Sequence, residues 1–433
     1  MMPDTLPVYP SLHPSLSTSS GDFIQIRSHT ESICSPLAIE DHVVQPAPFI
    51  SPPKWHLAHT SWFFDRFLLE PAGQGVAPGD SYHLMFNSYY KSQGAHWRQA
   101  DRGCLSRPTV SEVMSYRQQV TEKVTELIRS GRATDSQQRI IALGVQHEKQ
   151  HQELLLMDIK YIFAFHPQPL VYDRHSIPSG IDLSMPAHWV NFDEGLQQFG
   201  APADHFAYDN ERPRHPRWLC AFQLCSGLVT NEEYLRFIDD GAYRDPSLWL
   251  SDGWDWLQEQ GTEHPLYWFR QEGAWQEYHA GGREDLALSL PVSHISYYEA
   301  DAYARWAGAR LPTEFELEHF LNNIPEPENS SRRGSHAFWK PGAAICPHPS
   351  RAADKYGNGL LWQWTQSPYT PFPGFTPEPG SVSEYNGKFM SGQYVLRGGC
   401  VATPEGHSRP SYRNFYRPLD RWAFTGIRLA RDS

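Results

Sequence analysis

The feature that most constrains the fold is a change of sequence pattern near residue 165. Before it, apolar side chains recur every three or four residues over 109–131 and 135–165, which is the spacing of amphipathic helices. After it come a stretch with four prolines, 166–189, and then short apolar segments separated by Gly and Pro turns, from 190 to 433. The pattern predicts a helical domain, a linker and a second domain of mixed α and β structure.

The helical domain is expected over residues 23–165. It follows a tail, residues 1–22, that is rich in Pro and Ser and is expected to be disordered. A further helix is expected over 54–70, and Ser111 is the candidate N-cap of the helix over 109–131. Three or four helices joined by loops predict an up-down bundle.

The second domain is expected to be irregular and dense in loops. Two helices are predicted there, one over 230–241 and one over 296–321, the latter broken between Gly308 and Thr313. The expected fold class of the whole chain is therefore α+β.

Composition narrows the class of protein. The formal net charge is −12 without a long Lys/Arg run, so nucleic acid and anionic membranes are poor candidates as partners. The six cysteines form no C-x2-C pair, and the N-terminus lacks the basic and apolar regions of a signal peptide. Since no apolar run approaches the roughly 18 residues of a membrane span, a cytoplasmic protein with reduced thiols is expected.

The string QHEKQHQEL places His147 and His151 four residues apart, on one face of the expected long helix. At about 100° per residue, the Gln150 side chain falls on the same face and Glu153 falls off it. Two imidazoles at this spacing are typical of half a metal site, which needs at least one more ligand.

The same string reads H-E-x-x-H, the motif of zinc proteases. The chain has Leu154 and Met157 where the Gly and His of one protease class would follow, and no Glu lies between 154 and 193 for the other class. The third ligand is therefore expected upstream, in the string WHLAHT, where either His56 or His59 could complete the site. Glu148, which makes the string look like a protease, is interpreted as taking no part.

Three neutral imidazoles on one side of a metal leave up to three positions open. With iron this arrangement suits the joint binding of two substrates and dioxygen, and with zinc it suits hydrolysis. The alternative is that these histidines only pack, because the chain has 21 of them.

Several blocks in the second domain resemble a known fold. They are ARLPTEFELEHF at 309–320, GNGLLWQWT at 357–365, and the strings VLRGG and TGIRLAR nearer the C-terminus. Together they resemble the formylglycine-generating-enzyme fold, a relative of the C-type lectins. The activity of that enzyme is not implied, because it uses a pair of cysteines near its C-terminus and only Cys400 lies in that region here.

A bundle with His-x3-His-x-Glu fused to this fold is similar to one family, the iron-dependent sulfoxide synthases of ergothioneine biosynthesis, whose bundle is DinB-like. The strings that carry the resemblance are SPPKWHLAHTSWFF, FNSYY, QHEKQHQE and YRNFYRP. The resemblance implies that His59, His147 and His151 hold Fe(II). It also implies an O2-dependent reaction that joins the sulfur of cysteine or γ-glutamylcysteine to C2 of the hercynine imidazole, with one oxygen atom left on sulfur.

Further residues take their expected roles from this resemblance. Gln150 and Asn414 resemble positions that contact hercynine. The quaternary ammonium of hercynine donates no ordinary N–H hydrogen bond, so it needs aromatic faces or carbonyl dipoles, and Phe415 and Tyr416 are candidates for this contact.

A proton donor is also needed, and tyrosine is a suitable one. Tyr89 and Tyr90 of FNSYY resemble a tyrosine pair in the cysteine-using branch of the family, and Tyr369 in SPYTPFPGF is a third candidate. The carboxylate of the thiol substrate calls for an arginine, for which Arg98 and Arg102 are candidates. The FNSYY and EYNGKFM strings resemble the cysteine-using branch of the family, and this resemblance favours cysteine over γ-glutamylcysteine as the thiol.

Two alternatives stay open at this point. One is a relative that couples a different imidazole position, as in ovothiol synthesis, or that uses a selenium donor. The other is a non-catalytic protein, in which a lectin-like fold accompanies a thiol-binding or redox-sensing bundle.

Overall fold

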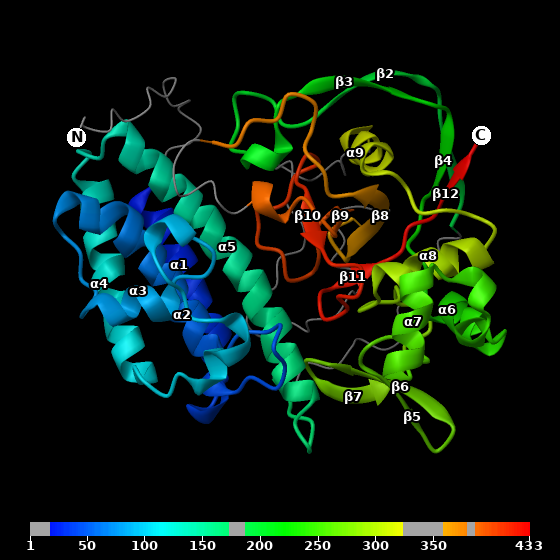
Figure 1. Cartoon of the computed structure of the whole chain (residues 1–433), viewed down its shortest axis with the longest axis horizontal. Helices are drawn as coiled ribbons and strands as arrows, with labels where there is room; N and C mark the ends of the chain where they lie inside the picture. Colours follow the sequence, from blue (N-terminus) through cyan, green and yellow to red (C-terminus); the bar gives the residue numbers. More distant parts are fainter. Residues whose placement is uncertain (1–17, 173–186, 324–357, 379–385) are drawn as a thin grey trace. The chain divides into compact units, whose positions relative to one another are not determined.

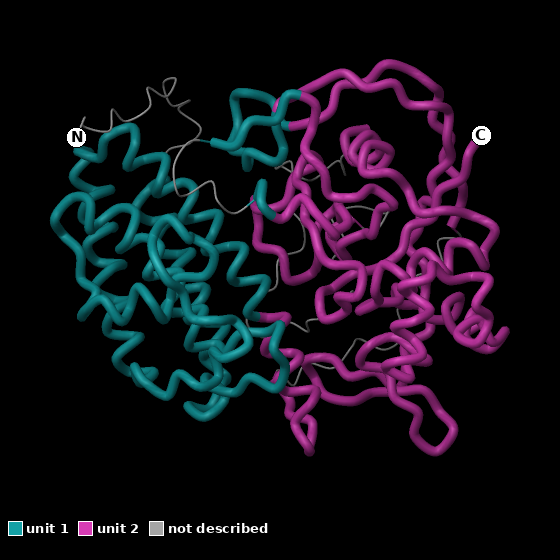
Figure 2. The backbone as a smooth tube through the Cα atoms, viewed as in Figure 1, with its two compact units in different colours: residues 1–155, 201–212, 374–388 teal, residues 156–200, 213–373, 389–433 magenta. Residues whose placement is uncertain are grey.

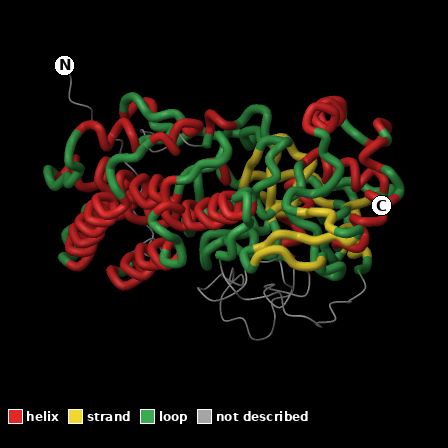
Figure 3. Tube along the Cα trace, turned by 90° about the horizontal axis from the view of Figure 1, so that it is seen from below, coloured by secondary structure: helices red, strands yellow, loops and turns green. Residues whose placement is uncertain are grey.

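The computed structural model describes residues 18–172, 187–323, 358–378 and 386–433. The chain divides into two units, which are shown in different colours in Figure 2. The segments of unit 1 are 1–155, 201–212 and 374–388, and those of unit 2 are 156–200, 213–373 and 389–433. Among the described residues, all strands belong to unit 2. Figure 3 draws these strands in yellow. The expected α+β class is confirmed.

Unit 1 is built from helices (Figure 1). Its α-helices are α1 (Ser20–Cys34), α2 (Pro53–Phe64), α3 (Asp80–Phe86), α4 (Val110–Arg129) and the part of α5 (Asp135–Ala164) up to Leu155, after which the helix belongs to unit 2. One turn of π-helix (Asp65–Leu69) extends α2, and short 3-10 helices occupy Glu40–Val43, Glu70–Ala72, Lys91–Gln93, Gln99–Cys104 and Asp209–Glu211. The helices expected over 54–70, 109–131 and 135–165 are all present.

Helix α2 is the central element of unit 1. All twelve of its residues are buried, and it packs against α1, α3 and α4. A helix that is covered on every side can carry polar groups only where these find partners within the protein. The buried polar residues His56 and His59 therefore need partners within the protein.

Three expectations about boundaries differ from the structure. The N-cap of α4 is Thr109 rather than Ser111, because the Thr109 hydroxyl accepts from the Glu112 N–H and the Glu112 carboxylate accepts from the Thr109 N–H. The end of the tail expected over 1–22 is helical, since α1 begins at Ser20 with the Ser19 hydroxyl as its cap. Residues 1–17 lie outside the described part.

The third difference concerns the expected linker, 166–189. Its first residues belong to unit 2 and form hydrogen bonds within it. The Tyr172 N–H donates to the Ala280 carbonyl at 2.9 Å, and the Tyr278 hydroxyl donates to the Leu170 carbonyl at 2.7 Å. The stretch 173–186 lies outside the described residues.

Unit 2 combines short sheets with helices. Its helices are α6 (Asn231–Asp239), α7 (Ser251–Gln260), α8 (Tyr297–Trp306) and α9 (Glu314–Asn323). Its strands are β1 (Trp189–Phe192), β2 (Gly195–Phe199), β3 (His215–Leu219), β4 (Phe222–Cys225), β5 (Trp268–Gln271), β6 (Ala274–His279), β7 (Gly282–Asp285), β8 (Trp362–Pro368), β9 (Tyr394–Arg397), β10 (Asn414–Tyr416), β11 (Thr425–Gly426) and β12 (Ala430–Asp432). The helices expected over 230–241 and 296–321 are present, the latter broken between α8 and α9.

The strands form four small sheets, with the orders β1-β4-β12, β10-β9-β8-β11, β2-β3 and β5-β6-β7. The strand pairs are antiparallel except for β11 on β8. A buried aromatic and aliphatic cluster, which includes Phe199, Phe222 and Phe315, packs α9 against β2 and β4.

The sequence blocks of unit 2 meet through buried ion pairs and a buried hydrogen bond. Arg397 donates to Glu314 at 2.8 Å and to Glu318 at 3.0 Å, and Arg413 donates to Glu314 at 2.8 Å. Arg428 donates to the Gln363 side chain at 2.6 Å. The charged residues of these blocks therefore join α9 to β9, and β8 to the C-terminal segment. None of the helices in the described part of the chain is long and apolar enough to cross a membrane.

Candidate metal centre

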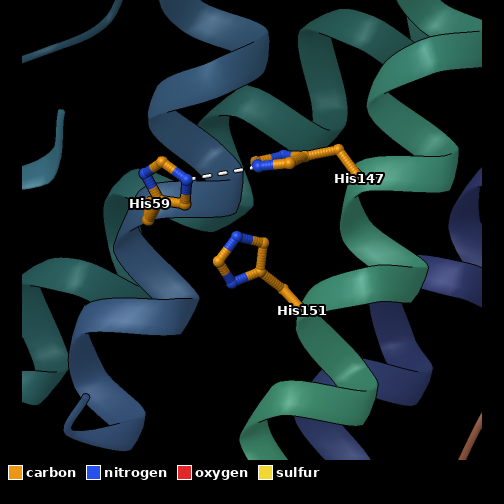
Figure 4. A group of neighbouring side chains, drawn as sticks. All are labelled: His59, His147 and His151. Atoms are coloured by element: carbon orange, nitrogen blue, oxygen red, sulfur yellow. Dashed lines mark hydrogen bonds between the residues drawn. The ribbon is translucent and has the colours of Figure 1, made fainter. Parts of the chain in front are cut away.

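Three histidines from two helices converge inside unit 1 (Figure 4). His59 comes from α2, and His147 and His151 come from α5. One ring nitrogen from each side chain lies within 4.8 Å of the other two. The Nε2 atoms of His59 and His147 are 3.2 Å apart, and a ring nitrogen of His151 points to the space beside them. Among the described residues, no other group of His, Cys, Asp or Glu converges in this way.

Burial keeps these imidazoles neutral. It lowers the pKa of His147 to about 4, and it lowers the pKa of His59 and of His151 well below the ordinary value. The neighbouring His147 adds to the lowering of the pKa in both His59 and His151. A neutral imidazole has one nitrogen lone pair, which is what a metal ion requires.

The spacing of these nitrogens fits a shared metal ion. Two imidazole nitrogens bound to one ion at about 2.1 Å, with an angle of about 90 to 110°, lie about 3.0 to 3.4 Å apart. The Nε2 atoms of His59 and His147 fall within that range. The donor set of three imidazoles suits iron, zinc, copper or nickel, so the donor atoms do not choose among these metals.

The Nδ1 atoms of His59 and His151 have different hydrogen-bond partners. His59 donates from Nδ1 to the Phe86 carbonyl at 2.6 Å, which leaves the lone pair on its Nε2. The Nδ1 atom of His151 lies 2.9 Å from Nδ1 of His56. The residue pattern left His56 and His59 open, and the family resemblance selected His59. The structure brings His59 into the cluster, while His56 contacts the far side of His151.

Aromatic rings hold His59 and His147 from the side. Trp55 stacks on His59 with ring centroids 4.4 Å apart and an angle of 12°, and the Trp55 indole N–H donates to the Met85 carbonyl at 3.0 Å. The ring centroid of Phe63 lies 4.7 Å from that of His147. The carbonyls of Met85 and Phe86 belong to the last turn of α3, whose C=O groups have no partner within the helix.

Glu148 has a structural role that the sequence pattern did not reveal. It is fully buried, and it accepts from Arg117 at 2.7 Å and from Arg27 at 2.8 Å. Arg27 also donates to Ser61 at 2.8 Å, so the network joins α1, α2, α4 and α5. The isolated arginines of α1 and α4 gave no pattern by which sequence reasoning could have paired them with Glu148.

The predicted tyrosines of unit 1 follow α3. Tyr90 is 3% exposed and lies among Trp62, Phe63 and Phe67, with ring centroids 5.0 to 6.4 Å away. Trp62 also stacks on His59. Tyr89 is half-buried, and its carbonyl accepts from Lys388.

The predicted arginines of unit 1 differ in exposure. The side chain of Arg98 is 83% exposed and pairs with Asp101 at 2.6 Å. Arg102 is buried, donates to the Ser51 hydroxyl at 2.7 Å and places its guanidinium 3.3 Å from the centre of the Trp55 ring. Gln150 is half-buried on α5, one residue before His151.

The remaining predicted site residues belong to unit 2. Tyr369 is buried and stacks on Phe415, with centroids 4.2 Å apart and an angle of 12°. Asn414 is half-buried, and its side-chain oxygen accepts from the Phe415 N–H at 3.0 Å. The Tyr416 hydroxyl donates to the Met157 sulfur at 3.8 Å. Tyr369, Asn414, Phe415 and Tyr416 thus come together around β10.

Two family models match the chain. The model of the DinB superfamily matches residues 22–157, and that of the sulfatase-modifying factor enzyme 1-like domain matches residues 182–321. These matches confirm the expected fold class, a DinB-like helical bundle followed by a domain of the formylglycine-generating-enzyme type.

Curated relatives match over most of the chain. A hercynine oxygenase of Mycolicibacterium smegmatis is 32% identical over 89% of this chain and 92% of the relative, and one of Mycobacterium tuberculosis is 31% identical over the same shares. The ergothioneine biosynthesis protein 1 of Schizosaccharomyces pombe is 28% identical over 61% of this chain and 31% of its own length. Identity above 30% along nearly the full length of both proteins shows that the chain belongs to the hercynine oxygenase family.

Proposed function

We propose that this protein is an oxidoreductase of ergothioneine biosynthesis that uses O2 to join the sulfur of a cysteine-type thiol to C2 of the hercynine imidazole. The observation that carries the proposal is the group of three neutral, buried histidines in a chain of this family. The reaction balances as follows. The C2–H and S–H bonds are lost, a C–S bond forms, one oxygen atom of O2 ends on sulfur, and the other leaves as water with the two hydrogens.

The proposed metal is Fe(II), held by His59, His147 and His151. When bound, iron supplies a Lewis acid that lowers the pKa of a thiol and a redox centre that reacts with O2. The neutral state of the three imidazoles supports this assignment, because each keeps a lone pair for the metal at neutral pH. The hydrogen bond from His59 to Phe86 directs that lone pair to Nε2.

Four residues are proposed to contact hercynine. Gln150 lies one residue before His151 on α5 and would hydrogen-bond the imidazole or the carboxylate of hercynine. Asn414 is proposed as a second polar contact, and Phe415 and Tyr416 as aromatic contacts to the trimethylammonium group. The position of these three residues on one short strand, β10, supports a shared role.

Tyrosine is proposed to supply the proton that directs oxygen to the coupling reaction. Tyr90 is favoured over Tyr89 and Tyr369. Tyr90 contacts Trp62 and Phe63, and these rings in turn contact His59 and His147. Packing among these rings restricts the Tyr90 side chain to few rotamers.

Arginine is proposed to bind the carboxylate of the thiol substrate. Arg98 has the more accessible guanidinium. Arg102 has the charge nearer to the histidines, since it contributes to the lowered pKa of both His59 and His151. Cysteine is the proposed thiol, and γ-glutamylcysteine is the competing one.

A substrate panel tests this function. The protein is loaded with Fe(II) without oxygen, mixed with hercynine or histidine and with cysteine or γ-glutamylcysteine, and then exposed to air. Mass spectrometry is expected to find a coupled sulfoxide with hercynine and cysteine. Product from histidine but not from hercynine would favour the ovothiol-type relative. Absence of both oxygen uptake and product would contradict the enzymatic proposal.

A further inference from the structure

We propose that His56 is a positioning residue for the metal centre, which holds the ring of His151 through a hydrogen bond between the two Nδ1 atoms. The inference rests on the proposed metal site and goes beyond it, because it gives a role to a histidine outside the ligand set. It also explains why α2 carries two buried histidines three residues apart.

The contact between the two rings is short and enclosed. The Nδ1 atoms lie 2.9 Å apart, and the ring planes meet at 60° with centroids 5.1 Å apart. His56 is 2% exposed and His151 is 7% exposed, so water competes little for this hydrogen bond. Both residues belong to unit 1, one on α2 and the other on α5.

Metal binding selects one arrangement of protons for this pair. A hydrogen bond between two imidazole nitrogens needs one N–H and one lone pair. If His151 binds the ion through Nε2, its proton sits on Nδ1 and is donated to the Nδ1 lone pair of His56. His56 then carries its own proton on Nε2. The contact with His56 therefore fixes both the tautomer and the direction of the His151 ring.

The three ligand rings are held in unequal ways. His59 donates to the Phe86 carbonyl, and His151 is paired with His56. Within the described part of the chain, Nδ1 of His147 has no hydrogen-bond partner. His56 therefore supplies one of the two hydrogen bonds that orient the ligands. Since such outer partners typically change metal affinity about 10 to 100-fold, its loss should be measurable.

The test replaces His56 and measures Co(II) binding without oxygen, which is a readout independent of turnover. His56→Phe keeps an aromatic ring but removes the acceptor. His56→Asn places an amide oxygen near the position of Nδ1 and keeps it. The matched control is His42→Phe, which removes another buried histidine of unit 1; within the described residues, its ring bonds the Ala38 carbonyl of its own segment. The dissociation constant is obtained by competition with a chelator, and the visible spectrum reports the coordination of the ion.

The expected result is a dissociation constant about 10 to 100-fold larger for His56→Phe, with an altered spectrum. His56→Asn and His42→Phe should stay within about threefold of the unmodified protein and keep its spectrum. If circular dichroism shows that His56→Phe is unfolded, His56→Leu takes its place.

Unchanged affinity and spectrum in His56→Phe would overturn the inference. So would His56→Asn binding as weakly as His56→Phe, because an acceptor near the position of Nδ1 would then not restore the affinity. A failure of the metal site itself looks different: the unmodified protein would bind no Co(II), or His59→Ala would bind it equally well.

Discussion

Glu148 ties the helix that carries two of the proposed ligands to the rest of the bundle. Burial alone would raise the pKa of this carboxyl, but the guanidinium groups of Arg117 and Arg27 outweigh burial and hold its pKa at about 2. The carboxylate is thus ionised and fully paired, although it lies directly beside His147. Its neighbours come from α1 and α4, so the rotation of α5 about its axis is fixed from two sides.

Removal of this carboxylate should destabilise the protein strongly. Glu148→Ala removes the buried carboxylate that pairs with both Arg27 and Arg117, and the free energy of unfolding should fall by about 3 to 5 kcal/mol. Denaturant unfolding measures this, with the exposed Glu122→Gln on α4 as the control. A loss below about 1 kcal/mol would show that the network is not needed for stability.

The lowered pKa of the Glu314 carboxyl should make the stability of unit 2 depend on pH. Burial would raise its pKa, but Arg413 and Arg397 lower it below the ordinary 4.5. A carboxyl whose pKa is lower in the folded than in the unfolded state contributes stability above the unfolded pKa, and this contribution is lost as pH falls through the folded pKa. Glu314→Gln should therefore be less stable than the unmodified protein at neutral pH, with the gap narrowing below about pH 4.5. Urea unfolding across pH checks this, and a gap independent of pH would contradict it.

At the scale of elements, the close approach of α2 and α5 places His59 beside His147. Gly144 permits it, because a Cβ atom there would lie 2.6 Å from Cζ of Phe64 and 3.0 Å from Cε1 of Phe63, both on α2. Glycine is unfavourable within a helix, so packing accounts for its presence in α5.

Gly144→Ala should force the two helices apart. We expect a loss of about 1 to 3 kcal/mol in the free energy of unfolding and weaker metal binding. Gly21→Ala in α1 is the control, since its Cβ would meet nothing closer than 3.7 Å. That change should leave metal binding intact and stabilise the protein by roughly 0.5 to 1 kcal/mol. Metal titration and thermal unfolding compare the two, and equal behaviour would refute the role given to Gly144.

The start of α4 offers a test of a single cap. Thr109→Ala removes the hydroxyl that accepts from Glu112 and should lower the free energy of unfolding by about 1 kcal/mol. Ser111→Ala, at the position expected from sequence to be the cap, should change it by only a few tenths. The reverse order in denaturant unfolding would show that the cap is misassigned.

At the scale of the whole molecule, the domain types could be predicted because their signals are local. Helical periodicity marks α4 and α5, and the charged blocks of unit 2 lie in strings whose members pair, as Glu314 does with Arg397. The pair His147 and His151 followed from helix geometry alone. The choice of His59 over His56 did not, because both lie on one face of α2 and the deciding groups, the Phe86 carbonyl and Nδ1 of His151, come from other elements.

The measurement that tests the central claim most directly is isotope tracing with and without His59. The Fe(II)-loaded protein receives hercynine, cysteine and ¹⁸O2, and the product is analysed by mass spectrometry. The account predicts a coupled sulfoxide that carries one ¹⁸O atom, and loss of both bound iron and product in folded His59→Ala. Undiminished product from His59→Ala, or a sulfoxide oxygen that comes from water, would contradict it.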